Sequence, residues 1–293
     1  MERGLQTREV QVGACAPSRG RRYGSRVQGS PPTCRPALAT LRLPLLLASL
    51  LITCAAPAAR ADDLRVLAAG AVESTLRDVV ATFEAQSGHA VKVTYGAVGL
   101  LRDRIVAGEP ADLAIVTPAI IEQLEAKALV KAGSRVDLGR VGGGIAVRVG
   151  ERAPPVGSPE ELRQALLAAD EIYFADPATA TAGAHLLAVA DQLGVGDLVR
   201  HKGHTAPGGK EAMRLMTLSR APAIGLTQIS EILSVQGVVL VGPYPAPLQR
   251  SSTYSGVLLA DAAHAEAAQA FLRFLRSATV QERLRRAGFD PVP

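Results

Sequence analysis

Within residues 64–87, the hydrophobic residues change from a continuous run to the spacing of an amphipathic helix. Leu64–Ala69 is a short apolar run with the length of a buried strand. Directly after it, Leu76, Val79, Val80 and Phe83 follow the i, i+3, i+4, i+7 spacing of one helix face. The ordered part of the chain is therefore predicted to begin with a buried strand and an amphipathic helix.

The same alternation then repeats toward residue 118. Val91–Tyr95 is the second strand, and Gly96–Gly99 is a tight turn into a helix that ends at Gly108. Asp112–Val116 is a third strand, and Thr117–Pro118 is a helix start with proline in the first helical position. A β-α-β-α-β order predicts a parallel, doubly wound sheet.

A second α/β unit follows, joined to the first by two crossover segments, Val141–Val147 and the Pro-rich Pro243–Ser255. We expect two doubly wound lobes around a cleft, with residues 62–142 plus 246–293 in lobe 1 and residues 143–245 in lobe 2. The predicted elements after residue 157 are helices at 158–167, from 183 to about 194, 209–218, 263–277 and 279–287, strands at 172–175, 223–226, 238–241 and 256–259, and a polar loop at 176–183.

Residues 1–61 form a leader in our interpretation. Leu41–Cys54 is the only long apolar run, with the length of a signal-peptide core, and Ala59–Ala61 fits a small-x-small cleavage site. This predicts a periplasmic protein that starts at Asp62, with a membrane anchor or a lipid on Cys54 as the alternatives. Residues 1–34 lack any periodicity, so we expect translation to begin near residue 35 or later.

The charge of the chain is uneven and does not indicate nucleic-acid binding. The net charge is +5, but residues 1–60 carry nine Arg against two acids, and the rest carries 23 bases and 25 acids. The basic balance therefore belongs to the leader, and no nucleic-acid partner is expected. All three cysteines also precede residue 62, so no disulfide is expected in the mature chain.

Four loops into helices are the candidate binding elements. In doubly wound sheets, ligands bind where strands end and helix N-termini present free N–H groups. Ordinary strand-to-helix turns use the same residues, so both interpretations remain open. The four loops are Gly70–Val72, Gly96–Gly99, Thr179–Gly183 and Pro207–Gly209.

The candidates for catalysis or metal binding are few. The mature chain has no cysteine nucleophile and no G-x-S-x-G motif. His201 and His204 form H-x-x-H without a third ligand, which is more typical of a solvated loop than of a metal site. Asp112 and Asp176 flank strands, where aspartate more often caps a turn than acts as an acid.

Several of these motifs, in this order, resemble the periplasmic molybdate-binding protein family. The resemblance is most specific in the first half of the chain and weaker through Phe174–Pro177 and Ala223–Leu226. The motifs that carry it are Val66–Ala71, Phe83–Gly88, Val93–Gly99 and Ile105–Leu113. The resemblance implies a type II periplasmic binding protein that delivers its ligand to an ABC permease, with an oxyanion bound between the lobes.

The resemblance also implies a set of ligand-binding residues. The family binds its dianion through backbone N–H groups, two serine hydroxyls and a tyrosine. Here Ala71 and Val98 stand where the family has serine, and Gln228 (or Thr227) takes the tyrosine position. Ala182 and Gly209 match the backbone donors. The candidate site residues are Gly70, Ala71, Ala97, Val98, Thr181, Ala182, Gly209 and Gln228.

Loss of the hydroxyl donors changes the expected ligand. Each missing charge-assisted hydrogen bond costs about 1.5–3 kcal/mol, so a small organic acid becomes a candidate beside a molybdate- or tungstate-like oxyanion. We expect a monomeric, non-enzymatic solute-binding protein without cofactor or metal. The alternatives are a periplasmic lyase or hydrolase, with Asp176, His185 or His204 as its acid–base residue, and a sensory or interaction module.

Overall fold

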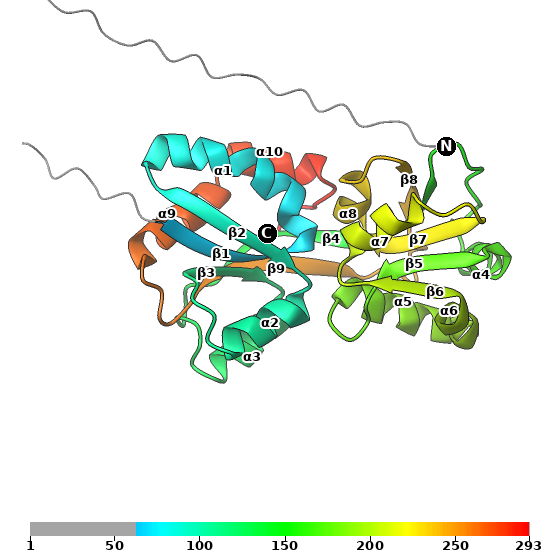
Figure 1. Cartoon of the computed structure of the whole chain (residues 1–293), viewed down its shortest axis with the longest axis horizontal. Coiled ribbons are helices and arrows are strands. Elements are labelled where there is room, and N and C mark those ends of the chain that lie inside the picture. Colours follow the sequence, from blue (N-terminus) through cyan, green and yellow to red (C-terminus); the bar gives the residue numbers. More distant parts are fainter. Residues whose placement is uncertain (1–62, 293) are drawn as a thin grey trace, which may run out of the picture. The chain divides into compact units, whose positions relative to one another are not determined.

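A computed structural model describes residues 63–292, in which strands and helices alternate (Figure 1). The first part confirms the predicted β-α-β-α-β order, because each apolar run is a strand and each amphipathic segment is a helix. Its elements are β1 (Asp63–Ala69), the 3-10 helix η1 (Gly70–Val72), α1 (Glu73–Ser87), β2 (Ala90–Gly96), α2 (Val98–Val106), β3 (Leu113–Val116) and α3 (Pro118–Glu125).

The rest of the chain forms a second α/β unit and then returns to the first. The second unit comprises β4 (Val136–Arg148), α4 (Pro159–Ala168), β5 (Glu171–Ala175), α5 (Thr181–Gln192), α6 (Gly196–Lys202), β6 (Gly203–Ala206), α7 (Gly209–Met216), β7 (Ala223–Gln228), α8 (Ile229–Leu233) and β8 (Val238–Pro243). The returning elements are β9 (Ser251–Leu258), α9 (Ala265–Leu275) and α10 (Ala278–Arg286).

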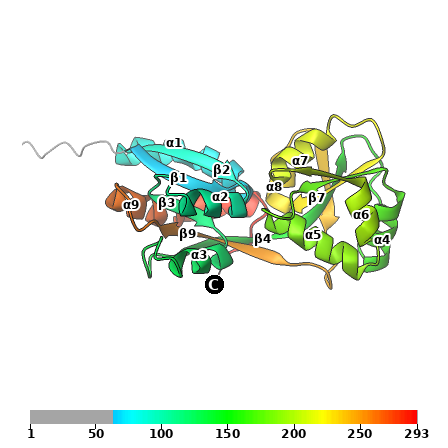
Figure 2. The same cartoon turned by 60° about the horizontal axis from the view of Figure 1, so that its bottom comes forward.

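Two groups of strands define two lobes. In lobe 1, β1 pairs in parallel with β2 and β3, and β9 pairs antiparallel with β3 and with the first half of β4. In lobe 2, β5 pairs in parallel with β6 and β7, and the second half of β4 pairs antiparallel with β7 and β8. Figures 1 and 2 show β4 and β9 running between the two groups. The exact residue limits of the lobes stay a prediction.

The point at which β4 changes partners is made of glycine. Gly142 pairs with Ser251 of β9, whereas Gly143 pairs with Gln228 of β7. A Cβ atom on Gly143 would lie 2.4 Å from the Tyr244 ring, so no larger residue fits without a shift. The close approach of this ring to the backbone therefore requires glycine at the crossover.

Each lobe has its own hydrophobic core. In lobe 1 one cluster joins the sheet to α1, α2, α3, α9 and α10, with Phe271 fully buried in it. In lobe 2 one cluster joins the sheet to α4, α5 and α6, and another joins it to α7 and α8. Helices thus cover both faces of the second sheet, as expected of a doubly wound unit.

The structure corrects three details of the predicted elements. Residues 196–206, expected to be irregular around His201 and His204, form α6 and the edge strand β6. The β4 crossover begins at Val136, well before Val141, and α8 follows β7 without being predicted. The missed elements α6, β6 and α8 have 7, 4 and 5 residues, too few to show a clear hydrophobic period.

Two expectations concern membranes and the leader. Among residues 63–292 we find no helix with the length and hydropathy needed to cross a bilayer. The predicted leader, its cleavage site and the three cysteines lie outside the described residues.

Candidate functional site

A cavity of about 620 Å³ opens between the ends of strands from both lobes. Lobe 1 contributes the loops after β1 and β2, and lobe 2 contributes the loops after β5, β6 and β7. All of the candidate binding residues line this one cavity: Gly70, Ala71, Ala97, Val98, Thr181, Ala182, Gly209 and Gln228. The structure therefore brings the predicted residues together, although their role in binding remains a prediction.

Helix starts from both lobes lie at this cavity, and no side chain of the preceding residue caps them. Ala97 precedes α2, Ala180 precedes α5 and Gly208 precedes α7, and none of these residues makes a side-chain cap bond. The first N–H groups of a helix have no partner within the helix and carry a partial positive charge. One of them, the Gly99 N–H of lobe 1, donates to the Thr179 carbonyl of lobe 2 at 2.9 Å.

Gln228 lines the cavity, but its amide is committed to the crossover strands. With the amide oriented to satisfy its neighbours, the nitrogen donates to the carbonyl oxygens of Gly142 at 3.0 Å and Val141 at 3.2 Å, and the oxygen accepts from Ser252 Oγ at 3.2 Å. Gln228 therefore ties β7 to the strands that join the lobes.

Tyr254, which the sequence analysis did not select, is a second side chain that joins the lobes at the cavity. It comes from β9, lines the cavity and is buried. Burial raises the pKa of its phenol, which hydrogen-bonds to the side chains of Thr181 and Gln228. A tyrosine is therefore present, but it comes from β9 and not from the end of β7.

Glu231 is the other residue that sequence analysis missed. It lies in α8, lines the cavity and is only 7% exposed. Thr227 Oγ1 donates to Glu231 Oε2 at 2.5 Å, and backbone groups of Gln228, Gly209 and Lys210 hydrogen-bond to the carboxyl. Burial raises the pKa of Glu231 in spite of these hydrogen bonds. The cavity therefore contains a buried carboxyl group whose pKa lies above the ordinary value.

Gly209 makes room for this carboxyl. A Cβ atom at residue 209 would lie 1.8 Å from Thr227 Oγ1 and 2.2 Å from Glu231 Oε2. The start of α7 can therefore approach the pair formed by Thr227 and Glu231 only because residue 209 is glycine. Gly209 was also selected from the sequence as a donor to ligand; its backbone lies beside the Glu231 carboxyl at the cavity, and its role in binding remains a prediction.

Charged side chains of the cavity wall are paired with each other. Lys210 of α7 donates to Glu73 Oε1 of α1 at 2.9 Å, which links the two lobes. Burial raises the pKa of Glu73, but hydrogen bonds from Lys210 and Arg77 outweigh it and hold this pKa below its ordinary value. Arg214 pairs with Glu211 at 2.7 Å. A bound anion can attract Lys210 only in competition with Glu73.

The residues proposed for an enzymatic alternative lie away from the cavity. Asp176 Oδ1 accepts from the Ala178 N–H within its own turn, and His204 stacks on the Tyr173 ring at 4.8 Å. His185 Nε2 lies 2.8 Å from the Leu248 carbonyl oxygen. None of the three lines the cavity, so the structure contradicts their selection.

Asp112 and the metal-site candidates also have other roles. The carboxylate of Asp112 accepts from the backbone N–H groups of Arg65 and His264, both at 2.8 Å, so it fixes two loops. Among the described residues, no group of three His, Cys, Asp or Glu side chains is placed to hold a metal ion.

Comparison with known proteins gives one family and two kinds of relative. The model of the family described as bacterial extracellular solute-binding protein matches residues 64–290. A protein of Pseudomonas sp. named aconitate isomerase is 30% identical over 266 residues, which cover 88% of this chain and 98% of that protein. The molybdate-binding protein ModA of Rhodobacter capsulatus is 26% identical over 254 residues, covering 85% and 96%.

Solved structures agree on the fold. The periplasmic molybdate-binding protein of Azotobacter vinelandii superposes with a TM-score of 0.67 at 20% identity, covering 79% of this chain and 100% of that one. The sulfate-binding protein SubI of Mycobacterium tuberculosis superposes with a TM-score of 0.65 at 19% identity, covering 79% and 87%. Together with the match over residues 64–290, these results show that the chain belongs to the bacterial extracellular solute-binding protein family, as a type II periplasmic binding protein of the molybdate-binding kind.

Proposed function

We propose that this protein is a periplasmic solute-binding protein whose cleft takes a small organic polycarboxylate, and not a tetrahedral oxyanion. The observation that carries the proposal is the cavity of about 620 Å³, in which apolar Ala71 and Val98 occupy the places of the expected hydroxyl donors. This volume falls within the range of about 300–1,000 Å³ typical of organic ligands. A molybdate ion would leave most of it to water.

The start of α7 supports the same choice. Backbone groups of Gly209 and Lys210 already bond to the Glu231 carboxyl. A dianion placed against these amides would have to displace an acidic group, and while that group is ionised it repels the ligand. A flexible acid can place its carboxylates at other helix starts, such as those of α2 and α5, and direct neutral carbon toward Glu231.

The charged wall offers a further contact for a carboxylate. Lys210 has a 38% exposed side chain and lies at the first turn of α7, beside the cavity. A ligand carboxylate that takes over Lys210 from Glu73 leaves Glu73 with its second partner, Arg77. Because Lys210 belongs to lobe 2 and α2 to lobe 1, a ligand that also places a carboxylate at the start of α2 would contact both lobes, as closure around a ligand requires.

The family supports the remaining parts of the proposal. Extracellular solute-binding proteins capture a ligand outside the cytoplasm, and the resemblance to the molybdate-binding proteins implies an ABC permease as the receiving partner. In this proposal the protein is a monomer that needs no cofactor.

A second candidate function is the isomerisation of such an acid. It is favoured by the relative of Pseudomonas sp. named aconitate isomerase, which is more similar to this chain than ModA is. One structural observation points the same way, because a buried carboxyl group with a raised pKa lines the cavity.

Thermal unfolding and calorimetry of the purified protein test the ligand class. We expect cis- or trans-aconitate, citrate or tricarballylate to stabilise the fold by about 2.7 kcal/mol at 100 times the dissociation constant. Lys210→Met is expected to weaken this binding roughly tenfold or more, since a charged hydrogen bond contributes about 1.5–3 kcal/mol. The exposed Lys127→Met is the matched control. Submicromolar binding of molybdate, with no effect of any polycarboxylate, would contradict the proposal.

A further inference from the structure

Glu231 lies where the two lobes meet at the cavity. One carboxyl oxygen, Oε2, accepts from Thr227 Oγ1 and faces the start of α7. The other, Oε1, lies 3.0 Å from the position of a Cβ on Gly70, at the start of η1 in lobe 1. The carboxyl group therefore stands between two of the predicted binding loops: residue 209 must be glycine to leave space for it, and a Cβ at residue 70 would be a tight contact.

Within the described part of the chain, no Lys or Arg side chain pairs with the Glu231 carboxyl. Among residues 63–292, the Lys and Arg side chains of the cavity wall pair with other acids, Lys210 with Glu73 and Arg214 with Glu211. Its own contacts come from one hydroxyl and from backbone groups. A carboxyl group in such surroundings can gain and lose a proton without breaking a salt bridge.

A helix-capping role accounts for part of this arrangement. Glu231 is the third residue of α8, and it bonds back to the backbone of Gln228, the residue that precedes the helix. Capping needs one acceptor oxygen and explains neither the cavity position of the group nor the bonds from α7. Glu161 provides the comparison, because it caps α4 in the same way from an exposed position.

The proposed ligand class contains one chemistry that a single carboxyl group can perform. Aconitate has a central carbon with a methylene carbon on one side and a vinyl carbon on the other. Each of these three carbons bears a carboxylate. Moving a proton from the methylene carbon to the vinyl carbon shifts the double bond across the centre. The product has the same constitution, and its double bond is cis or trans according to the conformation of the bound acid.

We propose, resting on the polycarboxylate ligand proposed above, that Glu231 is the catalytic residue that carries this proton and makes the protein an aconitate-type isomerase. The Glu231 carboxylate takes the methylene proton, and the C–H electron pair forms the new double bond. The electron pair of the old double bond moves into the adjacent carboxylate, which gives a dienolate. The Glu231 carboxyl then returns the proton to the former vinyl carbon. No atom or electron is gained or lost, and no cofactor takes part.

The cavity supplies stabilisation for the charge that develops in this step. The carboxylate that becomes the dienolate gains negative charge, and N–H groups at the starts of α2 and α5 would stabilise it by donating hydrogen bonds. The raised pKa of Glu231, caused by burial, makes its carboxylate a stronger base than an ordinary glutamate. The group is therefore suited both to take the proton and to return it.

Proton NMR of the full protein with cis- or trans-aconitate in D₂O tests this inference. We expect interconversion of the two isomers and entry of deuterium at the methylene position. Glu231→Gln keeps a capping oxygen but cannot carry a proton, so it should lose about 10²–10⁴-fold in rate while still binding trans-aconitate in a thermal-shift assay. Glu231→Asp, which keeps the acid on a shorter side chain, should retain part of the rate.

Glu171→Gln is the matched control, because Glu171 also accepts hydroxyl hydrogen bonds but lies outside the cavity, and its rate should be unchanged. Binding of aconitate by the wild type without turnover or deuterium exchange would overturn the catalytic role and leave the proposed ligand intact. Turnover by Glu231→Gln at the wild-type rate would also overturn it. Absence of any aconitate binding would instead refute the proposed ligand class.

Discussion

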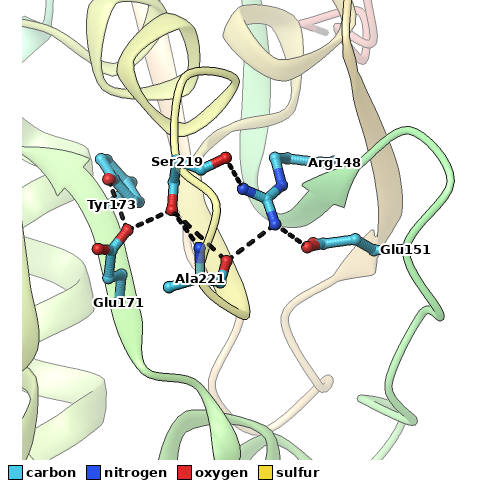
Figure 3. A network of polar contacts seen from close by, with 6 residues as sticks. All are labelled: Arg148, Glu151, Glu171, Tyr173, Ser219 and Ala221. Atoms are coloured by element: carbon cyan, nitrogen blue, oxygen red, sulfur yellow. Dashed lines mark hydrogen bonds and ion pairs between the residues drawn. The ribbon is translucent and has the colours of Figure 1, made fainter.

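Two glutamates of lobe 2 accept hydrogen bonds from hydroxyl groups and yet have opposite properties. Figure 3 shows the first, Glu171, which accepts from Ser219 Oγ at 2.5 Å and from Tyr173 Oη at 2.8 Å. In the same network the Arg148 guanidinium donates to the Ala221 carbonyl oxygen at 2.8 Å and pairs with Glu151. The network fixes the loop between α7 and β7 and lies outside the cavity.

The pKa values of these two glutamates shift in opposite directions because the two side chains differ in exposure to solvent. The hydrogen bonds from Ser219 and Tyr173 favour the charged form of Glu171 and lower its pKa. They outweigh the opposing effect of burial, because water still reaches this carboxylate. Burial raises the pKa of Glu231 although Thr227 and three backbone groups bond to it. Hydrogen bonds alone therefore do not decide the direction in which the pKa of a glutamate shifts. The extent of burial decides it, because loss of contact with water disfavours the charged form.

The largest effect on this comparison should come from Gly209→Ala. The new Cβ would collide with Thr227 Oγ1 and Glu231 Oε2, so the carboxyl must leave its place beside α7. We expect a loss of about 1–3 kcal/mol in the free energy of unfolding, measured by urea denaturation. Gly208→Ala is the control, since a Cβ there meets no atom within 4 Å. Equal stability of the two variants would show that the carboxyl moves freely.

A smaller effect, dependent on pH, should come from Glu231→Gln. Because the folded protein holds the Glu231 proton more tightly than the unfolded chain, this group favours folding at low pH, and its contribution is lost as pH rises through the folded pKa. The loss amounts to at most about 1.4 kcal/mol per pH unit. Unfolding of the wild type and the variant should therefore diverge as pH rises from about 4.5, in favour of the variant. Parallel pH profiles would show that the folded pKa is not raised.

The smallest effect should come from Glu171→Gln. The pKa of Glu171 is lowered, so its ionised form stabilises the fold above the unfolded pKa, and this contribution is lost as pH falls through the folded pKa. We expect the variant to lose less than about 1 kcal/mol at neutral pH, because the group is near the surface. The deficit should disappear in acid, which calorimetry at two pH values can measure. A deficit that grows in acid would contradict the sign.

The fold was largely predictable because its strands and helices have clear periods. The apolar run Leu64–Ala69 and the helix face of Leu76, Val79 and Phe83 were assigned from spacing alone, and glycine-rich turns located the cavity walls. The short edge strand β6 and the five-residue helix α8 were missed, since neither is long enough to show a period.

The chemistry of the site was harder to predict than its location. The helix predicted from residue 158 is present as α4, and its start is fixed by a reciprocal cap between Ser158 and Glu161. Glu231 offered only one weak signal, an acid placed among the apolar residues Ile229, Ile232 and Leu233. Its bond to α7 depends on residues more than 20 positions away in the chain, which no local pattern reveals. Asp176, His185 and His204 were chosen by residue type, and the fold directs all three elsewhere.

The shared strand β4 has a consequence for how the molecule comes apart. Its first half completes the sheet of lobe 1 and its second half completes the sheet of lobe 2, with Gly142 and Gly143 between the two. Unravelling either sheet therefore removes a neighbour from the other, so melting should spread through both lobes as one cooperative event. A ligand bound in the cavity would then protect distant residues from proteases as effectively as the residues that it contacts.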